Sequence, residues 1–98
     1  MYITITGASH FLGIEAFKPG MKVILKKDYN NDYDDESLKV VGDTGATYGY
    51  VANSVGTVAK GTHSSGYIYR DFDQEAEAEI MFVVKGVAIA KVLLKNKG

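Results

Sequence analysis

Acidic and amide side chains gather in one polar stretch of the chain, where their spacing is partly that of a calcium-binding loop. Asp28, Asn30 and Asp32 occupy the first, third and fifth positions of such a loop. The loop also requires glycine at its sixth position and a bidentate glutamate at its twelfth, where this chain has Tyr33 and Lys39. The chain has no cysteine, which excludes thiolate ligands. The sequence therefore predicts neither a metal site nor a cofactor, and the stretch is interpreted as a solvated acidic turn.

Serine and histidine are neighbours at two places, Ser9-His10 and His63-Ser64. Nucleophilic catalysis requires a hydroxyl and an imidazole that face each other, and sequence neighbours rarely do. The three glutamates of residues 75–79 alternate with apolar residues, which is typical of the solvent face of a strand rather than of an acid–base pair. We therefore expect a binding protein with no catalytic residues, not an enzyme. A hydrolase acting through Ser9 or His63 is the least favoured alternative.

The aromatic side chains indicate a binding function. The chain has seven tyrosines and four phenylalanines. Tyrosine combines a flat face for stacking with a hydroxyl for hydrogen bonding, which suits peptide and single-stranded nucleic-acid sites. Most of these tyrosines are expected to cover the rim of a small core. Tyr33 is the exception, because a bulky ring within a polar loop must either plug the end of a barrel or form a stacking platform.

These candidate residues lie among short strands. β-branched and aromatic content, or apolar–polar alternation, predicts strands at residues 2–6, 21–26, 38–41, 47–51, 67–70, 75–82 and 87–94. In the sixth of these, the alternation places Phe82 with Ala76, Ala78 and Ile80 on the face opposite the glutamates. A short helix is predicted from a cap at Asn53 or Ser54 to about residue 60. The expected fold is mainly β, a small six- or seven-stranded OB-like barrel with one or two short helices, because closure removes exposed sheet edges.

Length and composition predict a single domain over residues 1–98. No apolar run approaches the roughly 18 residues that a membrane-spanning helix needs, and the first residues lack the pattern of a signal peptide. We therefore expect a cytoplasmic protein without a membrane partner. The net charge of −1 argues against coating nucleic acid by bulk electrostatics. Lys18, Lys22, Lys26 and Lys27 have no acid among them, so a local basic face is compatible with this net charge.

An ordered set of motifs resembles the HIRAN domain family. The motifs are, in order, Pro19-Gly20-x-Lys22-Val23-x-Leu25, Asn31-Asp32-Tyr33-Asp34, Ser37-Leu38-x-Val40 and Gly45-x-x-x-Gly49-Tyr50-Val51. A basic strand, an Asn-x-Tyr-Asp turn, a hydrophobic strand and a Gly-Tyr-hydrophobic strand follow one another in a similar way in that family. The stretch between Gly7 and Gly13 resembles the opening turn of the family. The resemblance covers roughly the first half of the chain.

The resemblance implies a barrel related to the OB fold and a nucleic-acid-binding function. The family includes modules that hold the 3′ end of single-stranded DNA and that are often attached to helicase-type ATPases. It therefore implies single-stranded DNA as the ligand, a DNA repair or replication setting and a helicase-type protein partner. By position, Tyr33 would stack on a base and Asp34 would accept a hydrogen bond from the terminal 3′ hydroxyl. Tyr50 would line the same site.

Four further residues complete the site that the resemblance implies. Ser9, His10 and Phe11 occupy the opening turn, where the family offers a basic residue and a stacking aromatic. Lys26 belongs to the lysine-bearing strand beside the Asn-x-Tyr-Asp turn. The alternative hypothesis is a protein-interaction or scaffolding domain on the same barrel, which uses tyrosine-rich surface and exposed edges and has no DNA-end recognition.

Overall fold

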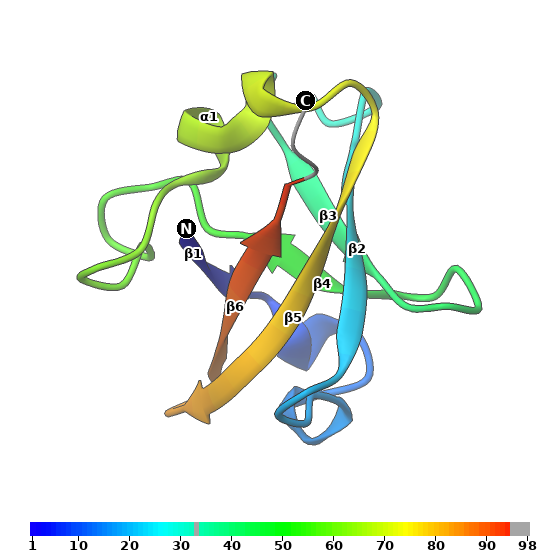
Figure 1. Ribbon diagram of the computed structural model, residues 1–98, viewed down its shortest axis with the longest axis vertical. Helices are drawn as coiled ribbons and strands as arrows, with labels where there is room; N and C mark the ends of the chain where they lie inside the picture. The colour runs from blue at the N-terminus through cyan, green and yellow to red at the C-terminus, as the bar shows by residue number, and fades with distance from the viewer. Residues whose placement is uncertain (33, 95–98) are drawn as a thin grey trace.

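Six antiparallel strands close into a barrel in the computed structural model, which describes residues 1–32 and 34–94 (Figure 1). The strands are β1 (Tyr2–Thr6), β2 (Lys22–Lys27), β3 (Leu38–Val41), β4 (Thr47–Val51), β5 (Glu75–Val84) and β6 (Val87–Leu93). They pair in the cyclic order β1-β4-β3-β2-β5-β6, so β3 and β6 lie on opposite sides of the barrel. The predicted mainly β, OB-like barrel is confirmed, with six strands.

Alternate residues of every strand line the interior of the barrel. The large buried side chains come mainly from β1, β2 and β3, and they include Ile3, Ile5, Val23, Leu25, Leu38 and Val40. The interior positions of β5 and β6 are mostly alanines, namely Ala76, Ala78, Ala88 and Ala90. Small and large inward side chains together fill a narrow barrel. The outward positions of these strands include Lys22, Ile24 and Lys26 in β2, Lys39 in β3 and Tyr50 in β4.

The short helix lies later in the chain than the sequence predicts. Segment 53–60 forms turns, in which the N–H groups of Thr57 and Val58 both donate to the carbonyl of Ser54. The glycine and the β-branched residues in this segment have poor helix propensity, which explains the error. The helix α1 (Ser65–Ile68) and the 3₁₀ turn η3 (Tyr69–Asp71) instead replace the strand predicted at residues 67–70.

Tertiary burial decides the conformation of α1. The side chain of Ser64 caps the helix by accepting from the N–H of Tyr67 at 3.2 Å. Ile68 is fully buried in the core, so the apolar contact outweighs the β propensity of the Tyr-Ile-Tyr sequence. Figure 1 shows α1 at one end of the barrel and the turn between β5 and β6 at the other.

The segment that precedes α1 covers the outer face of β1. Thr4 points outward from β1 yet is only 1% exposed. Its hydroxyl accepts from the N–H of Ala59 at 3.1 Å and lies 2.8 Å from the hydroxyl of Thr62. The N–H of His63 donates to the carbonyl of Tyr2 at 2.8 Å. These contacts fix one wall of a groove that is described below.

A register shift in β5 changes the face on which Phe82 lies. Ile80 pairs with Ala90 but Phe82 pairs with Ile89, so Met81 is an additional residue in β5. An additional residue of this kind is a β-bulge, which reverses the alternation of side chains beyond it. Phe82 is 50% exposed on the outer face of the barrel, and the prediction that it shares a face with Ile80 is wrong.

Candidate functional site

Aromatic and basic side chains meet on the outer face of three neighbouring strands. Lys26 in β2 is the Cα partner of Lys39 in β3, and Lys39 is in turn the partner of Tyr50 in β4. Directly opposed residues of paired strands project on the same face, so these three side chains are neighbours. The ring of Phe11 lies 6.0 Å from the ring of Tyr50, at an interplanar angle of 49°, and is 40% exposed. We call Phe11, Lys26, Lys39 and Tyr50 the ring–lysine face.

Phe11 reaches this face from the turn that follows β1. The 3₁₀ turn η1 (Ala8–His10) begins after Gly7, whose φ of 76° favours glycine, and the N–H of Phe11 donates to Ala8 O at 3.0 Å. Gly49 lets this turn pack closely on β4, because a Cβ atom there would lie 2.6 Å from the carbonyl oxygen of Thr6. The glycines of the opening turn and of β4 thus position an aromatic ring beside Tyr50.

The loop between β2 and β3 is held by side-chain hydrogen bonds that centre on Asp34. Its Oδ1 accepts from the N–H of Glu36 at 2.9 Å, and its Oδ2 accepts from Nδ2 of Asn53 at 2.9 Å. The N–H of Asp34 donates to Oδ1 of Asn31 at 3.1 Å. Oδ1 of Asn53 accepts from the N–H of Gly66 in α1 at 2.8 Å. Because a carboxylate accepts about four hydrogen bonds, Asp34 retains acceptor capacity for a ligand.

Asp28 connects the same loop to the ring–lysine face. The hydroxyl of Tyr50 donates to Oδ2 of Asp28 over a long distance of 3.4 Å. Burial raises the pKa of the Tyr50 hydroxyl above its usual value, and the negative charge of Asp28 and this hydrogen bond raise it further. Tyr50 is therefore neutral throughout the physiological range, and its ring can stack without introducing a negative charge.

Four acidic residues of this loop, Asp32, Asp34, Asp35 and Glu36, line a polar hollow of about 550 Å³. Carboxylates accept hydrogen bonds and repel anions, so such a surface is compatible with a hydroxyl or an amine and incompatible with a phosphate. Within residues 1–32 and 34–94, no cluster of three or more acidic or histidine side chains is placed to hold a metal ion.

The lysines between residues 18 and 27 do not form one continuous basic face. Lys26 projects outward between two neighbouring strands. Its Cα partner in β3 is Lys39, and its Cα partner in β5, on the other side, is Glu75. Nζ of Lys27 instead donates to the carbonyl of Phe72 at 2.8 Å. The charge available to an anionic ligand is therefore concentrated on the β3 side of Lys26.

The predicted site residues that the structure describes belong either to the ring–lysine face or to the acidic hollow. Ser9 and His10 are exposed on η1 beside Phe11, at the edge of the ring–lysine face. Asp34 belongs to the acidic hollow. Tyr33 lies outside the described residues. The ligand roles that the resemblance implies for these residues stay predictions.

Two residues of the site, Lys39 and Asn53, were missed from sequence. The alternation of residues 38–41 is sufficient to place Lys39 outward, on the same face as Lys26, because Leu38 and Val40 are buried. Asn53 has no comparable signal. Its amide joins Asp34 to α1, and that contact depends on a helix whose position the sequence did not predict.

Comparison with solved structures places this geometry in a known fold. The HIRAN domain of human HLTF has a TM-score of 0.67 and 18% sequence identity, with 92% of this chain and 69% of that chain covered. The fold is that of a HIRAN domain. A protein from Lactobacillus plantarum is similar as well, with a TM-score of 0.62, 17% identity and coverage of 91% of this chain and 85% of that chain. No family model and no curated protein matches the sequence.

The HIRAN fold explains why the sequence motifs meet in space. The opening turn and the Gly49-Tyr50 strand are distant in sequence, and pairing of β1 with β4 brings them together. Asp28, which follows β2, is joined to Tyr50 of β4 by the hydrogen bond from the Tyr50 hydroxyl. In the described part of the chain, no helix has the length and hydropathy needed to cross a bilayer.

Proposed function

We propose that this chain is a module that binds single-stranded nucleic acid, with single-stranded DNA and its 3′ end as the preferred ligand. The observation that carries the proposal is the ring–lysine face, where Phe11 and Tyr50 lie next to Lys39 and Lys26. An aromatic ring can stack on any base, which contributes about 1–3 kcal/mol of binding free energy per base. The ammonium groups of lysines attract the phosphates of the neighbouring nucleotides. The HIRAN fold is consistent with this function.

The acidic hollow supports the preference for a 3′ end. A terminal hydroxyl can donate to the remaining lone pairs of Asp34, whereas a terminal phosphate would be repelled by the four carboxylates around it. In this arrangement Tyr33 would stack on the terminal base, as the family resemblance implies. The rest of the strand would run toward the ring–lysine face, where its phosphates meet the lysines.

The proposed role is binding rather than catalysis. Of the two histidines, His10 is exposed on η1 and His63 stacks on Tyr67 with ring centroids 4.2 Å apart. Neither arrangement resembles a nucleophile–base pair. We also propose a DNA repair or replication setting with a helicase-type protein as a partner, as the family resemblance implies.

Fluorescence anisotropy at low salt tests the proposal. A short single strand with a free 3′ hydroxyl is compared with the same strand carrying a 3′ phosphate. We expect tighter binding of the free hydroxyl, and about tenfold weaker binding of both strands by Phe11→Ala, because one stacking surface is lost. Phe82→Ala is the matched control, since Phe82 is also a half-exposed phenylalanine but lies in β5. Equal affinity for the two strands together with an unchanged Phe11→Ala variant would contradict the proposal.

A further inference from the structure

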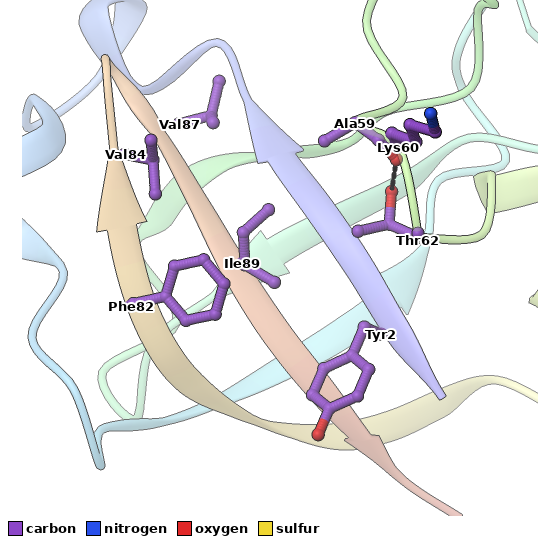
Figure 2. Close-up of a pocket in the computed structure, with 9 residues that line it drawn as sticks. Tyr2, Ala59, Lys60, Thr62, Phe82, Val84, Val87 and Ile89 are labelled. Carbon is purple, nitrogen blue, oxygen red and sulfur yellow. Dashed lines mark hydrogen bonds between the residues drawn. The ribbon is translucent and has the colours of Figure 1, made fainter.

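An apolar groove lies on the opposite side of the barrel from the ring–lysine face. Its volume is about 380 Å³. It is lined by residues 59–62, which cover the outer face of β1 and are called the covering segment, and by Tyr2 of β1, Phe82 and Val84 of β5, and Val87 and Ile89 of β6. Figure 2 shows the rings of Tyr2 and Phe82 on either side of Ile89, with Val84 and Val87 near the turn of the hairpin. Ligand sites commonly have volumes of about 300–1,000 Å³.

The β-bulge creates this groove. Met81, Phe82, Val83 and Val84 are consecutive, and each is between 36% and 50% exposed. Without the additional residue in β5, Phe82 would point toward the interior with Ile80. Four consecutive exposed apolar residues are unfavourable in water unless another surface covers them. The covering segment buries Thr4 but leaves the Phe82 side of the groove open.

The rim of the groove is basic. Lys60 is one of the lining residues, Lys91 is the Cα partner of Tyr2, and Lys85 follows Val84 at the exposed turn. The glutamates of β5 all precede the bulge, and only Glu79 reaches this rim, as the partner of Lys91. The positive charge of the rim therefore exceeds its negative charge.

We propose that this groove binds a short segment of a partner protein in which aliphatic or aromatic side chains are flanked by aspartate or glutamate. The apolar floor would bury the hydrophobic side chains, and the lysines would attract the flanking acids. The hydroxyl of Thr62 already donates to Ala59 O at 2.7 Å and contacts Thr4, so it offers little to a polar ligand. Hydrophobic side chains are the better complement.

Two other occupants fit less well. A second copy related by a twofold axis would bring the lysine-rich rim against an identical rim, and like charges in contact are unfavourable. A nucleic acid would gain from the lysines and from the rings of Tyr2 and Phe82, but the aliphatic floor of Ile89, Val84 and Val87 between these rings has no complement in a sugar–phosphate backbone. A peptide uses both the floor and the rim.

Selection from a phage-displayed library of random peptides of about twelve residues tests the proposal. We expect enrichment of peptides with at least two large apolar residues flanked by acids. Synthetic copies of the selected peptides should bind Phe82→Asp about tenfold more weakly than the wild-type chain, and Lys60→Glu should weaken them as well. Val55→Asp is the matched control, because Val55 is 99% exposed and does not line the groove.

Each outcome of this experiment decides the proposal. Absence of enrichment would overturn it. Equal affinity of the peptides for the wild-type chain and for Phe82→Asp would also overturn it, provided that the two proteins have the same melting temperature. A dimer in sedimentation that Phe82→Asp dissociates would assign the groove to a second copy instead. Loss of single-strand binding in Phe82→Asp would assign it to nucleic acid. Since the groove and the ring–lysine face share no residue, failure here leaves the proposed function standing.

Discussion

At the scale of single residues, Asp34 has a structural role in addition to the ligand role proposed for it. Its two oxygens accept from the backbone of Glu36 and from the amide of Asn53, so it joins the β2–β3 loop to the residues that precede α1. A variant at this position therefore changes the fold of the loop as well as the site. Substitution of a neighbouring acid of the hollow removes the same charge without removing these hydrogen bonds, and therefore provides a control.

We predict that Asp34→Asn lowers the free energy of unfolding by about 1–3 kcal/mol, because one of its two acceptors becomes an NH₂ group that faces a donor. Urea unfolding at neutral pH measures the loss. Asp35→Asn, at an exposed neighbour in the same acidic hollow, should change stability by less than about 0.5 kcal/mol. Equal stability of Asp34→Asn and the wild-type chain would show that the hydrogen bonds of Asp34 contribute nothing.

Tyr50 gives a second prediction at the same scale. Its pKa is raised first by burial and then by Asp28, so Asp28→Asn should lower the pKa but leave it above the usual value near 10. Ultraviolet titration of tyrosinate measures this, with Tyr50→Phe identifying which transition belongs to Tyr50. Because the folded pKa is the higher one, the contribution of Tyr50 to stability is complete below about pH 10 and is lost as pH rises through the folded pKa. A Tyr50 transition that does not move in Asp28→Asn would contradict this account.

At the scale of elements, the packing of the opening turn on β4 depends on the absence of a side chain at Gly49. Its neighbour on one side is the backbone oxygen of Thr6, which cannot move without disturbing the pairing of β1 with β4. This contact determines where Phe11 lies relative to Tyr50. Gly49 is therefore needed for the packing of the turn and, through the position of Phe11, for the proposed binding of a base.

We predict that Gly49→Ala costs about 1–3 kcal/mol of stability and weakens single-strand binding beyond what the loss of folded protein explains. Chemical unfolding measures the loss of stability. Anisotropy measures binding, with the affinity calculated from the concentration of folded protein that the unfolding curve gives. Gly56→Ala is the control, since a Cβ atom at Gly56 would have no neighbour within 4 Å. If the two alanine variants have the same stability, the close approach at Gly49 is not a constraint.

The strands could be predicted from sequence because each has a local signal, either alternation or a run of β-branched residues. The position of α1 could not, because its signal is the burial of Ile68, which depends on strands elsewhere in the chain. The bulge at Met81 was missed for a related reason. Nothing in the sequence of β5 marks an additional residue, and only the pairing with β6 reveals it. For Lys39, by contrast, the alternation of β3 is a sufficient signal for its outward position, and the pairing of β3 with β2 and β4 gives its neighbours Lys26 and Tyr50.

At the scale of the whole molecule, a net charge of −1 requires that any attraction of nucleic acid be local. The cyclic strand order separates two surfaces of different character. The ring–lysine face spans β2, β3 and β4, while the apolar groove spans β5, β6 and β1. Lys39 and Ile89 belong to strands on opposite sides of the barrel, so one chain could hold a nucleic acid and a protein segment at the same time.

The dependence of single-strand binding on salt tests the local character of this attraction. With about two lysines near phosphates, the logarithm of the binding constant should fall with the logarithm of salt concentration at a slope of about −1.4. Lys39→Gln should reduce the magnitude of that slope by about half, since one counterion fewer is released. Lys60→Gln, which removes the same charge from the rim of the groove, should leave the slope unchanged. Equal slopes for Lys39→Gln and Lys60→Gln would mean that the strand responds to the overall charge of the chain, and the ring–lysine face would then not be the site.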